Sequence, residues 1–228
     1  MGVNVSAVYQ HSFDLRSIEH FYEELTKGMK FPRVVQCISK VNQHNPHLVR
    51  PWSLQRERII ESYNYGPFDP DHFAGDEYME INGPGGFSFI FNKNICEFSP
   101  CFRWYSFIEN KGLQFKIRTI CKEISNYFGY NFAIYVGDNY CASDYVFDGR
   151  DMEYYKAALM RRFGKPKNTI SELIQRSSEG WKSEGYFIDY FKDLSVDNGF
   201  ATLESTFNPN SDWIYSLERQ IKKYSLHY

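Results

Sequence analysis

The stretch from Phe87 to Val136 constrains the fold of this chain more than any other feature. Aromatic side chains alternate at Phe87, Phe89 and Phe91, which is typical of a strand with one buried face. From Leu113 onward apolar residues recur at helical spacing, and residues 132–136 then form a short apolar run that predicts a buried strand. The centre of the fold is therefore expected to contain two strands, a helix and a third strand.

The second strand of this block is expected at 101–108, after a turn at Lys93 and Asn94. The helix that follows is predicted to end at Gly129, because glycine favours the end of a helix. Its apolar stripe consists of Leu113, Ile117, Ile120, Cys121, Ile124 and Phe128, and its opposite face carries Lys116, Arg118, Lys122, Glu123 and Asn126.

The region before this block is expected to hold a strand that starts at Val3 and a helix that ends at Gly28. Asp14 or Ser17 can cap that helix, because their side-chain oxygens accept hydrogen bonds from free backbone amides. A short helix is predicted over 54–63, and the turn-rich segment 64–86 is long enough to conceal a strand at 78–81.

After residue 136 the pattern predicts a helix over 151–163 and a second helix that starts at a capping box, Thr169 and Glu172. Two strands are expected at 186–191 and 200–204, followed by a last helix capped by Asn210 or Ser211.

Together these elements predict the α+β class, with a mainly antiparallel sheet and helices packed on one face. The order strand, helix, strand, strand, helix, strand can form an elaborated split βαβ core. We expect one domain over residues 1–228, with a long loop-rich insertion at about 42–86.

Charge and cysteine content narrow the function classes. The net charge is −2, with 26 basic and 28 acidic residues, so the chain lacks the basic excess of a nucleic-acid binder. Five cysteines without regular spacing argue against a disulfide framework. Because no run of 18 apolar residues occurs, we expect a cytoplasmic protein that does not associate with a membrane.

The aromatic content is 18%, which packing of the core explains in part and an aromatic binding surface could also explain. Acidic residues gather in the predicted loops, where they could engage a basic partner. The candidate binding residues are Asp69, Asp71, Asp76, Glu77, Trp104, Tyr105, Asp138 and Tyr140.

An alternative is a small metal-dependent hydrolase. His44 and His47 could bind a divalent ion together with Asp71 and His72, since imidazoles and carboxylates are common metal ligands. The two histidines lie in a loop rich in Pro and Asn, without the helical spacing that makes paired histidines a specific signal. No catalytic residue can be named, and no cofactor motif occurs, so we expect no cofactor.

Three segments resemble small cytoplasmic bacterial immunity-type proteins that are encoded beside polymorphic toxins. The resemblance lies in the sequences LQFKIRTICKEISNYFGYNFAIYVGD at 113–138, RRFGKPKNTISELIQ at 161–175 and YFIDYFKDL at 186–194. Those proteins act by binding, so the resemblance implies a protein partner, for example a toxin, and no catalytic residue.

The sequence therefore favours a non-enzymatic protein-binding module, with a toxin-neutralising role as its specific form. A third reading is an RNA-binding sheet on which Phe89, Phe91, Trp104 and Tyr105 would stack with bases. The charge balance disfavours RNA, and neither the identity of a partner nor the oligomeric state follows from the sequence.

Overall fold

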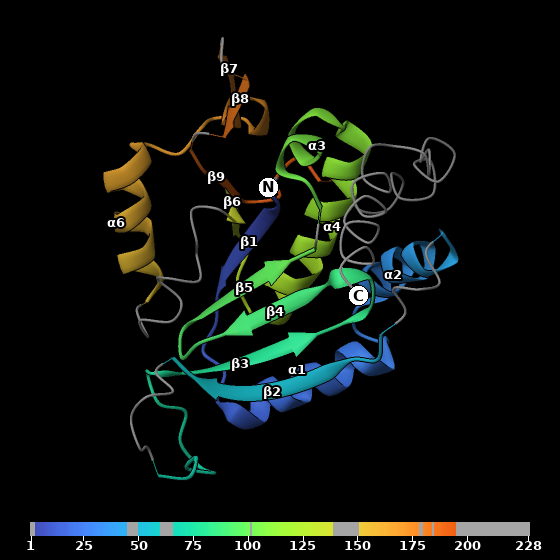
Figure 1. The fold of residues 1–228 in the computed structure, drawn as a ribbon, viewed down its shortest axis with the longest axis vertical. Coiled ribbons are helices and arrows are strands. Elements are labelled where there is room, and N and C mark those ends of the chain that lie inside the picture. The colour runs from blue at the N-terminus through green and yellow to red at the C-terminus, as the bar shows by residue number, and fades with distance from the viewer. Residues whose placement is uncertain are drawn as a thin grey trace, which may run out of the picture.

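A seven-stranded antiparallel sheet organises the protein (Figure 1). The computed structural model describes residues 3–44, 50–59, 66–100, 102–138, 151–177, 180–183 and 185–194. The strand order is β2-β3-β4-β5-β1-β6-β9, and every neighbouring pair is antiparallel. The strands are β1 (Val5–Gln10), β2 (Ser53–Arg58), β3 (Glu77–Asn82), β4 (Ser88–Phe91), β5 (Ile95–Ser99), β6 (Ala133–Gly137) and β9 (Phe187–Asp189).

Helices pack on this sheet, so the α+β class is confirmed. One face carries α1 (Leu15–Lys27), α2 (Pro32–His44), α3 (Trp104–Glu109) and α4 (Lys111–Tyr127). In Figure 1 strands β2 to β5 lie in front, with α1 partly hidden behind β2. The opposite face carries α6 (Met152–Phe163). The remaining elements are the short helices η2 (Pro84–Gly86) and η4 (Ile170–Leu173) and the hairpin β7 (Ile174–Ser177) and β8 (Gly180–Ser183).

The central four strands have the predicted split βαβ arrangement. β1 and β4 are both antiparallel to β5, so they are parallel to each other with β5 between them. Likewise β5 and β6 are both antiparallel to β1 and lie on either side of it. Two βαβ units therefore interlock, one through α1 and the other through α4.

The insertion at 42–86 adds strands to this core. The predicted concealed strand is confirmed as β3, which pairs with β4. The prediction of a helix over 54–63 is wrong for the described residues of that segment. They belong to strand β2, which pairs with β3 from Ser53↔Asn82 to Arg58↔Glu77. Period-two alternation of Leu54, Arg56 and Arg58 toward the helix side outweighs the helix propensity of Arg and Glu in this segment.

The strand predicted at 101–108 is also wrong. β4 pairs instead with β5, and the chain then turns into α3. Trp104, Phe107 and Ile108 are all buried, and their spacing of three and four residues is helical. The segment resembled a strand in the sequence because Trp104, Ser106 and Ile108, which are spaced by two residues, are all buried.

Aromatic side chains fill the core between the sheet and its four helices. Phe21 of α1 contacts the rings of Phe31, Phe89 and Phe91 at centroid distances of 5.1–5.4 Å. Phe89 stacks on Phe98 at 4.7 Å. Each fully buried ring contributes roughly 1.5–3 kcal/mol relative to exposure to water. Most of the aromatic excess therefore stabilises the fold.

Helix boundaries follow the predicted caps. Asp14 Oδ1 accepts from the backbone amide of Ser17 at 2.8 Å, and Gly28 ends α1 with φ of 71°. The apolar stripe of α4 is confirmed, since all six of its residues are buried. The capping box of Thr169 and Glu172 forms a 3.1 Å hydrogen bond but starts only η4. The strand predicted at 200–204 and the last helix lie outside the described residues.

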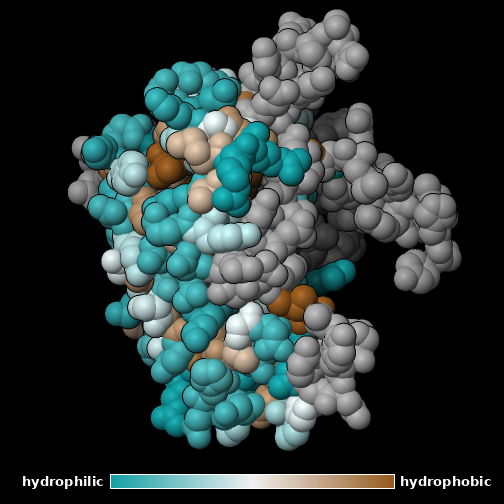
Figure 2. Space-filling model, turned by 90° about the vertical axis from the view of Figure 1, so that its left-hand side faces the viewer, coloured by the Kyte–Doolittle hydropathy of each residue, from teal (hydrophilic) through white to brown (hydrophobic). Residues whose placement is uncertain are grey.

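A second apolar cluster joins α6 to the outer side of β1 and β6. Met152, Tyr155 and Leu159 of α6 pack with Val8 and Ile134. Figure 2 shows this side of the molecule, where hydrophilic residues predominate and hydrophobic ones form small separate patches. In the described part of the chain, no helix has the length and apolar character needed to cross a membrane.

Candidate functional site

The side of β2 to β4 that faces away from α1, α2 and α4 is a candidate binding surface, which we call the outer face. Strand alternation and register place its residues. Glu80 lies opposite Gln55 on one side and Ile90 on the other, so these three form a row across the strands. Its members are Ser53, Gln55, Glu57, Tyr78, Glu80, Asn82, Ser88 and Ile90.

The outer face is acidic. It carries Glu57 and Glu80 and neither Lys nor Arg, and the row continues to Glu97 on β5. Tyr78 donates its hydroxyl to Glu57 Oε2 at 2.5 Å. Among the described residues, no ion pair joins Glu57 or Glu80 to a cation. Two uncompensated carboxylates on partly exposed strand positions therefore favour a cationic ligand.

On the helix side of the same strands, the carboxylate of Glu77 is buried and paired with two arginines. Glu77 is 2% exposed and accepts from Arg56 Nη2 at 2.5 Å and from Arg58 Nη2 at 3.2 Å. Burial alone would raise the pKa of Glu77, but the hydrogen bonds from Arg56, Ala74 and Arg58 hold it below its usual value. Both guanidinium groups also lie 4.6 Å from the ring centroid of Phe68. This cluster fastens the 66–76 loop to β2 and β3.

The predicted acidic residues of this loop have separate environments. Asp69 and Asp71 are exposed, and Asp71 Oδ1 lies 3.9 Å from Arg16 Nη2. Asp76 is partly exposed and its carbonyl accepts from the amide of Ile59. Glu77 is enclosed by the two arginines and has no surface to offer a partner, which corrects its assignment as a contact residue. A binding role for the three aspartates remains a prediction.

The predicted aromatic contacts also divide. Trp104 is 2% exposed because α3 turns it into the core, so it is not accessible to a partner. Tyr105, the next residue of the helix, is 38% exposed and remains a candidate. Phe89 and Phe91 are fully buried under the helices. The stacking surface expected for RNA therefore keeps only Tyr105.

The fifth acidic candidate, Asp138, closes the edge between β1 and β6. Its Oδ1 accepts from the amide of Asn4 at 2.8 Å, and its own amide donates to the carbonyl of Asn4 at 2.9 Å. Asp138 thus has a structural contact as well as a partly exposed position. Tyr140 lies outside the described residues.

Only some residues of the alternative metal site are among those that the structure describes. His72 is exposed, and its carbonyl accepts from Arg56 Nη2 at 2.7 Å. His44 ends α2; its side chain and the whole of His47 lie outside the described residues. Within the described part, no three His, Cys, Asp or Glu side chains come together where they could hold a metal ion.

Sequence reasoning missed an ionic cluster on α4. Arg118, assigned to the polar side of the helix, is buried and donates to Asp189 at 2.6 and 3.0 Å and to Asp193 at 2.5 and 2.9 Å. Burial alone would lower its pKa, but these hydrogen bonds raise it. Tyr135 donates its hydroxyl to Asp189 at 3.3 Å. The cluster joins α4 to the turn after β9, where Phe191 has φ of 56°.

His11 was also missed, because a single histidine at the end of a strand carries no pattern. Its Nε2 donates to the carbonyl of Asn92 at 2.9 Å, and its Nδ1 accepts from the amide of Phe13 at 3.0 Å. Burial lowers the pKa of His11 to about 4. Both ring nitrogens are engaged, so this histidine maintains the fold.

None of the three described cysteines, Cys37, Cys96 and Cys121, has an activated thiol. Burial raises the pKa of Cys121 to about 12 and that of Cys37 to about 12, and it also raises the pKa of Cys96. A nucleophilic cysteine needs the opposite shift. The prediction that Cys121 is a small buried side chain in the helical stripe is confirmed.

The described residues thus include an acidic surface, the outer face, and ionic clusters around Glu77 and Arg118 that stabilise the fold. Comparison of the chain with protein-family models, with curated proteins and with solved structures finds no match.

Proposed function

We propose that the protein is a binding module that holds a basic protein partner against the outer face of its sheet. The observation that carries the proposal is the pair Glu57 and Glu80, which lie on adjacent strands of a face without Lys or Arg. Complementary charge accelerates association and selects between partners.

The chemistry of the face suits a protein surface. Tyr78 presents an aromatic ring beside the two carboxylates. Ile90, which is partly buried against the α6 cluster, adds an apolar contact between Glu80 and Glu97 in the row. Tyrosine is enriched among the residues that dominate binding energy, and arginine is the partner residue that pairs best with a carboxylate. A partner loop with one or two arginines fits this combination.

The finer form of the proposal is a toxin-neutralising protein. It rests on the resemblance of 113–138, 161–175 and 186–194 to immunity-type proteins. A cationic toxin encoded beside the gene is therefore the first partner to test. Co-expression of the chain with that toxin should restore growth of the host cell.

The decisive experiment compares two double variants with equal changes of charge. Tagged wild-type protein and the double variant Glu57→Gln, Glu80→Gln are purified from the native host, and proteins that accompany them are identified by mass spectrometry. The matched control is Glu19→Gln, Glu109→Gln, because both of these glutamates are exposed and lie on α1 and α3, on the opposite side of the sheet from the outer face.

We expect one partner to accompany the wild type and the control but to be lost from the outer-face variant. A zero-length reagent that joins carboxylates to amines should link Glu57 or Glu80 to a lysine of that partner. With purified partner, the outer-face variant should bind at least about tenfold more weakly, which corresponds to about 1.4 kcal/mol. A partner that both variants retain equally would refute the proposal.

A further inference from the structure

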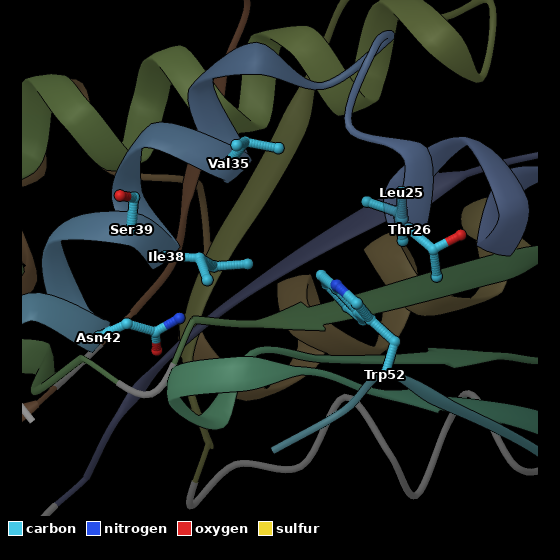
Figure 3. Close-up of a pocket in the computed structure, with 7 residues that line it drawn as sticks. All are labelled: Leu25, Thr26, Val35, Ile38, Ser39, Asn42 and Trp52. Carbon is cyan, nitrogen blue, oxygen red and sulfur yellow. The ribbon is translucent and has the colours of Figure 1, made fainter. Parts of the chain in front are cut away.

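A pocket lies on the helix side of the sheet, where the end of α1, the middle of α2 and the residue before β2 meet (Figure 3). Its volume is about 490 Å³, within the range of roughly 300–1,000 Å³ that small-molecule sites occupy. The lining consists of Leu25, Thr26, Val35, Ile38, Ser39, Asn42 and Trp52. It lies on the opposite side of the sheet from the outer face.

Among the residues that the structure describes, no charged side chain lines the pocket. A charged ligand would lose hydration there without gaining an ionic partner, which is costly. Leu25, Val35, Ile38 and Trp52 instead supply apolar surface, and Val35 is 42% exposed. The pocket therefore suits an uncharged, largely apolar molecule.

Trp52 is a rigid wall of this pocket. A Cβ atom on Gly83 would lie 2.3–2.6 Å from three carbons of the Trp52 ring, so the ring packs directly on the Gly83 backbone. The carbonyl of Trp52 also accepts from the Tyr22 hydroxyl at 3.2 Å. An aromatic ring fixed in this way is preorganised to receive a second planar ring.

Asn42 provides the polar contact. Its amide nitrogen points toward the cavity, while its oxygen points away (Figure 3). That Oδ1 atom is buried without a hydrogen-bond partner among the described residues. Thr26 differs, because its hydroxyl donates to the Glu23 carbonyl at 2.8 Å. Asn42 Nδ2 is thus placed to donate a hydrogen bond into the cavity.

We propose that this pocket binds a small uncharged molecule that carries a planar ring and a carbonyl group. The ring lies against Trp52, and the carbonyl oxygen accepts a hydrogen bond from Asn42 Nδ2. The apolar, uncharged lining beside Trp52 favours an uncharged ring in the ligand. The side-chain amide of Asn42 favours a ligand with a carbonyl group. This site is independent of the partner proposed for the outer face.

Three probes of equal ring size separate these contributions: benzamide, toluene and benzoate. Each is titrated into the full isotope-labelled chain, and NMR shifts of the α1 and α2 amides and of the Trp52 indole are followed. We expect benzamide to bind with a dissociation constant on the order of millimolar. Toluene should bind about fivefold to tenfold more weakly, because it lacks the hydrogen bond, and benzoate should not bind.

Asn42→Leu should abolish the preference for benzamide and leave toluene binding unchanged. Ser39→Ala is the matched control, because the Ser39 hydroxyl points away from the cavity (Figure 3), and it should bind all three probes as the wild type does. Trp52→Leu should weaken benzamide and toluene together. Equal binding of benzoate and benzamide, no shifts at saturating benzamide, or an unchanged preference in a folded Asn42→Leu would overturn the proposal.

Discussion

Glu77 and Glu80 lie three residues apart on β3 and serve opposite sides of the sheet. Glu77 points to the helix side, is 2% exposed and is held by two arginines. Glu80 points to the outer face, is partly exposed and has no cation beside it in the described part of the chain. The same residue type therefore stabilises the fold at one position and remains available to a partner at the other.

The helix side holds the charges whose loss should cost most. Arg118→Met leaves Asp189, which is 2% exposed, without its cation. Removing one partner of a buried ion pair costs about 3–5 kcal/mol, and denaturant unfolding at pH 7 measures that loss. The comparison variant Asp193→Asn removes a partner whose side chain is 71% exposed, so it should cost about 1 kcal/mol or less. Equal losses would show that Asp189 does not depend on Arg118.

His11 should make stability depend on pH. Its pKa is lowered from 6.5 to about 4 in the folded protein, so the unfolded chain binds a proton first as the pH falls. The contribution is complete above pH 6.5 and is lost between pH 6.5 and about 4. The full loss corresponds to about 3 kcal/mol, since one pKa unit equals about 1.4 kcal/mol.

The titration of Glu123 changes the stability in the opposite direction over the same pH range. Glu123 must therefore be replaced before the effect of His11 can be measured. Burial raises its pKa to about 7, while its carboxylate accepts from the amide of Arg33 at 3.3 Å. A raised carboxyl pKa stabilises the fold at low pH, and that contribution is lost as the pH rises toward 7. Unfolding between pH 7 and 4 should therefore be followed in Glu123→Gln, with His11→Asn added to flatten the slope. His72→Asn, at an exposed position, should leave the slope intact.

Glu77→Gln should cost about 2 kcal/mol, because it weakens hydrogen bonds between charged groups. The loss also loosens the loop that carries Phe68, so limited proteolysis within 66–76 should become faster. A double-mutant cycle with Arg56→Met tests the contact itself, since Arg56 Nη2 lies 2.5 Å from Glu77 Oε2. Additive losses would show that the pair does not act as a unit.

Elements with a period of their own were predictable from the sequence. The α4 stripe repeats over sixteen residues, so its pattern fixes both the element and its buried side. The alternation of Val5, Ala7 and Tyr9 predicts the strand β1, but Val8 on the other side is buried as well, against α6. The 101–108 segment misled because Phe102, Trp104, Ser106 and Ile108 alternate while Trp104, Phe107 and Ile108 also fit a helix. Eight residues do not distinguish the two periods.

The ionic clusters were not predictable, because they depend on contacts between distant segments. Arg118 and Asp189 are 71 residues apart, and Arg56 and Glu77 are 21 apart. Composition shows only that such charges exist. The register of β2 on β3 decides that Arg56 faces Glu77 while Glu57 faces outward with Glu80, and register is set by pairing across the whole sheet.

The smallest effect on stability is the most informative for function. Glu80→Gln should change the free energy of unfolding by less than about 0.5 kcal/mol, because no ion pair joins Glu80 to a cation among the described residues. Glu57→Gln should cost about 1 kcal/mol, because it also weakens the hydrogen bond from the Tyr78 hydroxyl. Thermal and denaturant unfolding of the two single variants, beside Glu77→Gln, measure this. A loss of stability as large as that of Glu77→Gln would mean that Glu57 and Glu80 stabilise the fold and are not free to bind a partner. Near-wild-type stability together with loss of the partner would instead separate the two sides of β3, because one glutamate would then maintain the structure and the other would bind.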